Sequence, residues 1–186
     1  TMPLIIRCPA GAGRSYGPTH SQSFEGLLLN IPNLTVICPS SPGEAAGLLL
    51  GAYDEAKPTI FIEHKAIYSR KEDVQTPLNP IPVGQARIVQ EGTDLTLISY
   101  GRHLSTCIRA ASEAVASGIS VEVLDLRTIK PLDTATILAS VRKTGRAITV
   151  EESPLIGGIG GEIAAQVAEH AFDYLLAPIR RLGAAE

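Results

Sequence analysis

The chain has 186 residues, of which 45% are hydrophobic and 19% charged, and its formal net charge is −3 at pH 7. This composition is typical of a globular protein that can bury one large core or two small ones. The sequence has no run of Lys or Arg, no apolar stretch long enough to cross a bilayer and no pattern typical of a signal peptide, so we expect neither nucleic acid nor a membrane as a partner.

Alternating strand and helix signals organise the first block, residues 1–69. Short apolar runs rich in β-branched residues predict three strands, at 4–8, 35–38 and 59–62. A Gly- and Pro-rich loop follows the first strand and carries His20, and a helix-like segment follows at 24–29. A longer helix is predicted over 43–55. The residues expected on its apolar face recur every four positions: Ala45, Leu49 and Tyr53.

Three prolines within residues 70–82 predict an extended linker, because proline fixes φ and cannot donate a ladder hydrogen bond. The second block, residues 83–186, alternates again. Its apolar runs predict strands at 95–100, 121–124 and 147–150. Asp133 suits the N-cap of a helix over 134–143. Two further helices are predicted from apolar faces, one with Leu104, Ile108, Ala111 and Val115 and one with Ile163, Val167 and Ala171.

Near-continuous apolar strands that alternate with helices are typical of α/β proteins. We therefore predict, in each block, a mostly parallel sheet with helices on both faces. Residues 125–133 are interpreted as a solvated strand-to-helix loop. The glycine-rich turn at 157–162 matches neither GxGxxG nor a Walker pattern, so tight packing of a helix on the sheet is favoured over phosphate binding.

The three cysteines, Cys8, Cys38 and Cys107, are widely spaced, odd in number and without a CxxC pair. This pattern argues against a disulfide framework and a zinc site, and it favours a reducing compartment. All three lie in or beside apolar segments, so we interpret them as small core residues.

Of the four histidines, His20 is the candidate for chemistry, because α/β proteins commonly place functional side chains on loops at strand tips. A lone loop histidine is also commonly solvated or structural, and the residues alone leave both interpretations open. His64, His103 and His170 have no metal-ligand spacing, and we interpret each as structural or exposed.

Several motifs then occur in a fixed order along the whole chain. They are IRCP at 6–9, HSQS at 20–23, IPNL at 31–34, PTIFIEHK at 58–65, EGTDLT at 91–96, VLDLRT at 123–128, KTGR at 143–146 and GGIGGE at 157–162. With these motifs the sequence resembles the beta subunit of the 2-oxo acid dehydrogenases. That family is the thiamine-diphosphate-dependent decarboxylating component of the pyruvate, branched-chain and acetoin dehydrogenase complexes.

The resemblance implies a domain organisation and a set of site residues. Residues 1–69 would be the C-terminal half of a transketolase-like pyrimidine-binding domain, 70–82 a linker and 83–186 a transketolase C-terminal domain. His20 would be the active-site histidine that faces the cofactor and the bound 2-oxo acid, and no cofactor-binding residue is assigned within the chain. The family's structural potassium site, formed mainly by backbone carbonyls, would correspond to Met2, Leu4, Ile5, Ala52, Glu55 and Lys57.

Cofactors and partners follow from the same resemblance. Thiamine diphosphate with magnesium would be shared with an alpha subunit. A second beta subunit and an acyltransferase core with lipoyl and subunit-binding domains would be the other partners, the acyl group passing to the lipoyl domain. The compartment would be the cytoplasm, or the mitochondrial matrix in a eukaryote.

The resemblance also places a further part of the family's subunit before Thr1, so we expect a fragment that is inactive alone. Two alternatives stay open: a transketolase or deoxyxylulose-phosphate-synthase relative, and a non-catalytic subunit-docking module. The residues at 21–23 and 63–65 favour the dehydrogenase over the first alternative.

Overall fold

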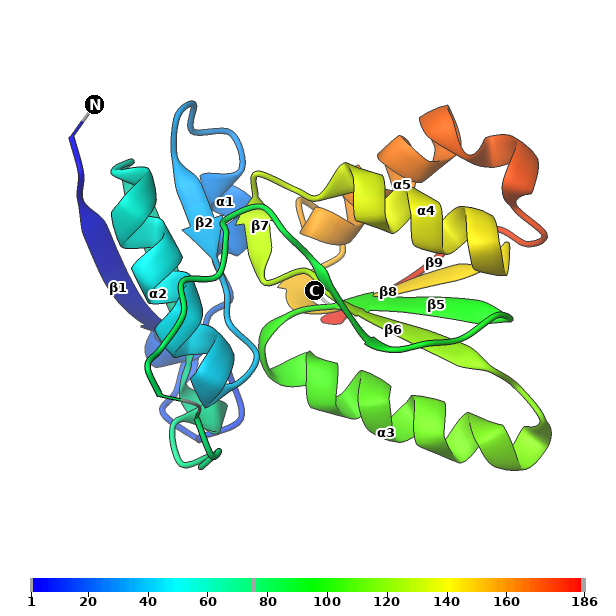
Figure 1. Cartoon of the computed structure of the whole chain (residues 1–186), viewed down its shortest axis with the longest axis horizontal. Helices are drawn as coiled ribbons and strands as arrows, with labels where there is room; N and C mark the ends of the chain where they lie inside the picture. The colour runs from blue at the N-terminus through cyan, green and yellow to red at the C-terminus, as the bar shows by residue number, and fades with distance from the viewer. Residues whose placement is uncertain (1, 75, 185–186) are drawn as a thin grey trace.

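The computed structural model describes residues 2–74 and 76–184, which form two sheets with their helices (Figure 1). The elements of the first block are β1 (Ile5–Ala10), α1 (Glu25–Leu28), β2 (Thr35–Ile37), α2 (Pro42–Glu55) and β3 (Thr59–His64). Those of the second block are β4 (Arg87–Gln90), β5 (Leu95–Ser99), α3 (Leu104–Ala114), β6 (Val121–Asp125), β7 (Thr128–Lys130), α4 (Thr134–Thr144), β8 (Ala147–Pro154), α5 (Ile159–His170) and β9 (Arg180–Ala184). The described part of 70–82 holds neither helix nor strand.

The first sheet has the strand order β1-β3-β2-β7, in which β1, β3 and β2 are parallel and β7 is antiparallel to β2. Helix α2 covers one face, where Leu48 and Ala52 pack on Ile37 and Phe61. The carboxyl ends of β1 and β3 lie side by side, since Ala10 pairs with His64. Loops that leave these two ends therefore share one edge of the sheet, the edge at which open α/β sheets bind ligands.

Strand β7 shows that the interpretation of 125–133 as a solvated loop is wrong. Four residues of this stretch are buried, namely Asp125, Leu126, Thr128 and Ile129. The physical reason is the edge of β2, whose backbone groups need partners. β7 supplies them, and just beyond β2 the Cys38 N–H donates to the Arg127 carbonyl at 2.9 Å. A segment of the second block thereby completes the first sheet.

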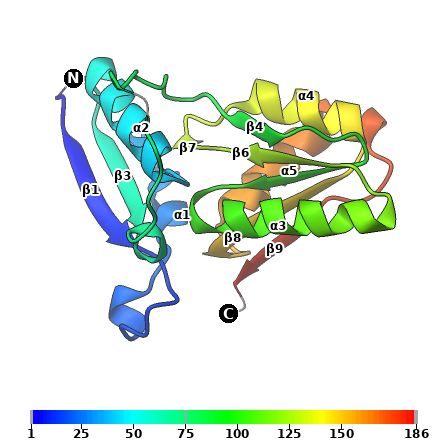
Figure 2. The same cartoon turned by 60° about the horizontal axis from the view of Figure 1, so that its bottom comes forward.

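The second sheet has the order β4-β6-β5-β8-β9 and is parallel except for β4 at its edge. Helix α3 covers one face, and α4 and α5 cover the other (Figure 2). The predicted fold class, α/β with mostly parallel sheets, is confirmed. β4 was not predicted, and β8 continues past the predicted 147–150 to Pro154. This extension brings two glutamates, Glu151 and Glu152, into the strand.

One apolar cluster spans both blocks. Ala10, Val36 and Ile62 of the first sheet belong to the same cluster as Leu124 and Ile163 of the second block. The face of the first sheet that α2 leaves free is thus buried against the second block. Because burial of apolar area is the main favourable term in association of such layers, this shared core fixes how the blocks sit on one another.

The predicted apolar face of α2 is wrong in part. Tyr53 is 76% exposed, whereas Leu48 and Ala52 are buried. Glycines shift the face, because a Cβ on Gly51 would lie 1.9 Å from the Ile81 carbonyl oxygen of the linker. Only a residue without a side chain admits the linker backbone there.

The other helix predictions fare better. Ile163, Val167 and Ala171 are all buried, and the Asp133 side chain caps α4 by accepting from the Thr136 N–H at 3.1 Å. Val115 is the exception, since it lies beyond the end of α3 and is exposed.

The cysteines behave as small core residues. Cys38 and Cys107 are buried and Cys8 is half-buried. Burial raises the pKa of the Cys107 thiol to about 11, so this group stays protonated at neutral pH. Within residues 2–74 and 76–184, no helix has both the length and the apolar character that a bilayer crossing requires.

Candidate active site

His20 lies where the sequence predicts it, in the loop between β1 and α1. It ends the short 3-10 turn Pro18–His20 and is exposed. An open cavity of about 480 Å³ lies beside it, lined also by Tyr16, Phe24 and Lys65. Ala10 at the end of β1 and Lys65 just after β3 place this cavity at the carboxyl edge of the first sheet. An imidazole here can exchange protons with a molecule in the cavity.

Lys65 links the end of β3 to the His20 turn. Its Nζ donates a hydrogen bond to the His20 carbonyl oxygen and lies 5.2 Å from the centroid of the Tyr16 ring. The ammonium is thus satisfied by a backbone carbonyl and an aromatic face, a common arrangement for a partly desolvated cation. The contact holds the backbone of His20 and leaves the residue exposed.

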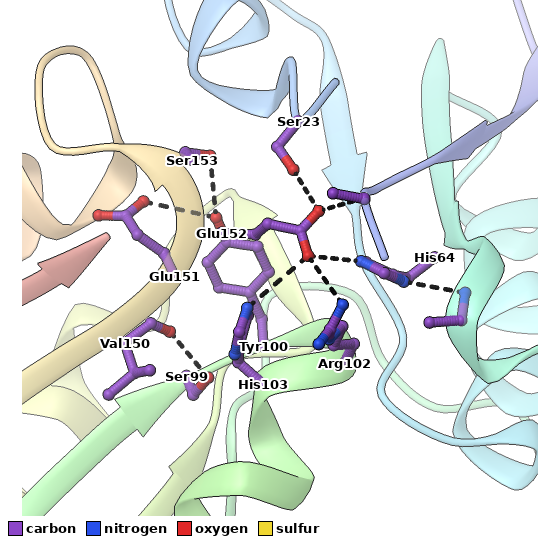
Figure 3. A network of polar contacts seen from close by, with 12 residues as sticks. Ser23, His64, Ser99, Tyr100, Arg102, His103, Val150, Glu151, Glu152 and Ser153 are labelled. Atoms are coloured by element: carbon purple, nitrogen blue, oxygen red, sulfur yellow. Dashed lines mark hydrogen bonds and ion pairs between the residues drawn. The ribbon is translucent and has the colours of Figure 1, made fainter. Parts of the chain in front are cut away.

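We call residues 11–23 the His20 loop. Its two ends meet, because the Gly11 N–H donates to the Gln22 carbonyl at 3.1 Å. A single carboxylate oxygen, Glu152 Oε1, accepts from both ends, from the Ala12 N–H at 2.6 Å and from Ser23 Oγ at 2.9 Å (Figure 3). Glu152 belongs to β8, so the base of the His20 loop is attached to the second sheet.

The other oxygen of Glu152 faces three basic side chains. His64 Nε2, at the end of β3, lies 2.9 Å from Oε2, and Arg102 and His103, in the turn before α3, each lie 3.7 Å from it. The Ala66 N–H donates to His64 Nδ1, so the ring proton of His64 is on Nε2 and is donated to Glu152. Figure 3 shows the three side chains converging on this one oxygen of the carboxylate.

The groups that surround Glu152 keep its carboxylate ionised. Burial by itself would raise the pKa of Glu152, but the contacts with His103, with His64 and with the Ala12 N–H outweigh burial and hold that pKa well below its usual range. Gly11 is required beside the cluster, because it has a φ of +90° and a Cβ there would lie 2.1 Å from His64 Nε2.

Glu151, the neighbour of Glu152 in β8, is part of a separate buried network. Glu151 accepts a hydrogen bond from the Gly160 N–H at 2.9 Å. In the same network, the hydroxyl groups of Tyr100 and Ser153 donate to the Glu25 carboxylate at 2.8 and 2.9 Å. Burial raises the pKa of Glu151 to about 7.

The glycine-rich turn at 157–162 packs against this network. A Cβ on Gly160 would lie 2.5 Å from the Glu151 carboxylate. The predicted packing role holds for Gly158 and Gly160, whereas a Cβ on Gly157 would meet nothing within 4 Å.

His64 and His103 make structural contacts, which agrees with their interpretation from the sequence. Read one at a time they carry no site spacing, but the fold brings both to Glu152, which sequence reasoning missed. The available signal was the acidic pair 151–152 directly after a predicted parallel strand, where polar side chains of several strands meet. His170 is exposed and lies 3.9 Å from Glu169.

Four of the six residues assigned to a potassium site line one cavity of about 300 Å³, namely Leu4, Ile5, Ala52 and Lys57. Met2 is exposed, and Glu55 Oε2 accepts from Lys57 Nζ at 2.9 Å. In the described residues, no three or more His, Cys, Asp or Glu side chains form a group that could hold a metal ion. The potassium assignment, which rests on carbonyl oxygens, stays a prediction.

Two family models match the chain. The model described as "Transketolase, C-terminal domain" matches residues 84–186, and the model described as "Transketolase, pyrimidine binding domain" matches residues 1–71. The solved structure titled "Split gene transketolase, inactive beta4 tetramer" is similar in fold. It has a TM-score of 0.83 and 25% sequence identity, and the match covers 98% of this chain and 57% of that one.

Curated relatives include two proteins named "Pyruvate dehydrogenase E1 component subunit beta". The one from Staphylococcus epidermidis is 42% identical over 185 residues, which is 99% of this chain and 57% of the relative. The one from Staphylococcus aureus is 40% identical over 187 residues, which is 100% of this chain and 58% of the relative. The chain therefore spans a little more than half the length of these relatives.

Proposed function

Because the chain belongs to the transketolase family and is a homologue of pyruvate dehydrogenase E1 beta subunits, we propose that it forms part of the beta subunit of a thiamine-diphosphate-dependent 2-oxo acid dehydrogenase. The observation that carries the proposal is the position of His20. Its ring is exposed on an open cavity at the carboxyl edge of a parallel sheet, in a loop fixed at its base by Glu152. Pyruvate is the substrate that the names of these relatives suggest.

The cavity beside His20 fits a heteroaromatic cofactor and a small polar substrate. It combines the aromatic side chains Tyr16 and Phe24 with the polar groups of His20, Gln22 and Lys65, and it is open to its surroundings. When bound, thiamine diphosphate supplies the electron sink for carbon–carbon bond cleavage. His20 would hold or release a proton at its exposed ring as charge develops on the substrate. We assign no residue of this chain to the diphosphate or to magnesium.

The partners would complete the site and carry the product away. An alpha subunit would share the cofactor and magnesium, a second beta subunit would be a further partner, and the open cavity leaves room for another chain. The acyl group would pass to the lipoyl domain of an acyltransferase core. Such an assembly would work in the cytoplasm, or in the mitochondrial matrix of a eukaryote.

A transketolase-type function is the second candidate, and one observation favours it: the structural match to a split-gene transketolase. Identity to that protein is 25%, against 40–42% to the dehydrogenase subunits. Offering a 2-oxo acid and a ketose phosphate to the same preparation separates the two, since each class should turn over only one of them.

The test of the proposed function is decarboxylation of pyruvate and of a branched-chain 2-oxo acid by the chain joined to the rest of its subunit and combined with an alpha subunit. We expect no activity from the isolated chain and turnover from the assembly. His20→Ala should lower turnover by about 10²–10⁴-fold, the range for loss of a general acid–base group. His170→Ala, which changes an exposed histidine outside the cavity, is the matched control. Assembly with unchanged activity in His20→Ala would refute the role of His20.

A further inference from the structure

We propose that Glu152, contributed by the second block, is a positioning residue that fixes the His20 loop against the end of β3. Its two carboxylate oxygens bind different segments of the chain. Oε1 accepts from Ala12 and Ser23 at the two ends of the loop, and Oε2 accepts from His64 at the end of β3 (Figure 3). One side chain thereby joins three segments that are far apart in the sequence.

Glu152 has no substitute in this position. In the described part of the chain, the hydrogen bonds between the His20 loop and the second block number two, and both end on Glu152 Oε1. The other polar contacts of the loop stay within the first block, such as Arg14 to Ser69 at 3.4 Å and Lys65 to the His20 carbonyl. Without the carboxylate, the loop would keep its own closure but lose its attachment to β8.

The charge of Glu152 matters as well as its shape. Backbone and hydroxyl donors bind an ionised carboxylate more strongly than a neutral acceptor, by about a factor of two in energy. The Arg102 guanidinium lies 3.7 Å from Oε2, as does the His103 ring, and its positive charge partly balances the carboxylate without taking the bonds that hold the loop. The carboxylate also stays ionised at neutral pH, since its pKa is held well below the usual range.

The consequence for chemistry rests on the proposed function of His20. A general acid–base group must be held within hydrogen-bond reach of the reacting atoms, and a small displacement lowers the rate. Glu152 does not line the cavity beside His20, so its contribution would act through the loop. It is therefore a positioning residue, and the second block takes part in shaping the site through it.

The experiment compares three variants of the purified chain by amide hydrogen exchange and by the NMR signals of the histidine rings. Glu152→Gln keeps the shape and removes the charge, and Ser23→Ala removes one donor only. Glu151→Gln is the matched control, because it changes the neighbouring buried carboxylate, which does not contact the loop. We expect exchange at the Ala12 amide to be about tenfold faster in Glu152→Gln and a few-fold faster in Ser23→Ala. The His20 ring signals should shift in both, and neither readout should change in Glu151→Gln.

Two results would overturn the proposal. One is an unchanged Ala12 amide and unchanged His20 signals in Glu152→Gln. The other is an equal increase in exchange at Ala12 and at the Val123 amide in the middle of β6, which would mean that the whole fold has loosened. Neither readout uses turnover, so both decide the role of Glu152 even if the proposed function fails. In an active assembly, Glu152→Gln should lower kcat more than it changes KM.

Discussion

The interior of the second sheet and the junction between the two sheets each hold a glutamate with several polar partners, Glu122 buried and Glu152 half-buried, but they differ in where those partners come from. In the second sheet, Glu122 accepts from Ser140 at 2.5 Å and pairs with Lys143, both in α4. At the junction, Glu152 collects partners from the His20 loop, from β3 and from the turn before α3.

A glutamate with several hydrogen-bond partners therefore serves two different structural purposes in this protein. Around Glu122 the polar network is supported by further bonds, such as Thr96 to Ser140 and Thr144 at 2.8 Å, so it holds a helix on its own sheet with redundancy. Around Glu152 a single side chain carries the attachment of the His20 loop to the second block. We therefore expect changes in the second sheet to alter global stability, and changes at the junction to alter the loop.

The largest effect is expected from Leu97→Ala, which disrupts the core of the second sheet. Leu97 is buried between the second sheet and α3. Truncation of a buried leucine leaves a cavity and lowers the free energy of unfolding by about 2–5 kcal/mol. Urea unfolding measures the loss, and Val115→Ala at an exposed site is the control. The His20 ring signals of the folded protein should stay in place. If they moved as they do in Glu152→Gln, the two regions would not be independent.

The same two regions differ in how well the sequence predicts them. The second sheet follows from local signals: apolar runs give β5, β6 and β8, and the Asp133 cap marks the start of α4. The junction depends on contacts between residues far apart, since Ala12 and Ser23 lie 140 and 129 positions from Glu152.

Periodicity cannot reveal such contacts, because it reports only which face of an element is apolar. For this reason His20 could be placed on its loop, but the convergence of His64 and His103 on Glu152 could not. Strand β7 was missed on the same ground, since its partner β2 lies in the other block. On α2, the linker that packs against Gly51 shifts the buried face away from the one that periodicity predicts.

The next effect concerns the pH dependence of stability, to which the neighbours Glu151 and Glu152 contribute in opposite directions. The pKa of Glu151 is about 7 in the folded chain, above its ordinary value of 4.5, because burial disfavours its charged form. Between these two values the folded chain binds more protons than the unfolded chain, so stability falls as pH rises through this window. Glu152 acts in the opposite sense, since its lowered pKa adds stability that is present at neutral pH and is lost progressively as the pH falls below about 4.5.

Glu151→Gln should therefore gain about 1–3 kcal/mol relative to the wild type between pH 5 and pH 7.5. Urea unfolding of both proteins at the two pH values measures this difference. The glutamine oxygen can still accept from the Gly160 N–H, so the packing of α5 is kept. Asp125, whose pKa burial raises to about 6, makes the wild-type stability fall in the same direction and is unchanged in the variant. An equal stability difference at both pH values would contradict the assignment.

The smallest effect is expected at Gly118. A substitution there changes the backbone outside the polar networks of Glu122 and Glu152, so it tests whether those two regions respond to strain elsewhere. Gly118 ends the turn after α3 with a φ of +70°, and a Cβ there would meet nothing within 4 Å. Gly118→Ala should cost about 1 kcal/mol, the penalty for a left-handed alanine. Gly118→Asn should cost less, because asparagine tolerates this conformation. Gly11 also has a positive φ but contacts His64, so its alanine variant should in addition release the Ala12 amide. If Gly118→Ala also accelerated hydrogen exchange at the Ala12 amide, backbone strain at a distant site would be enough to loosen the His20 loop. That result would contradict a specific role of Glu152 in holding the loop.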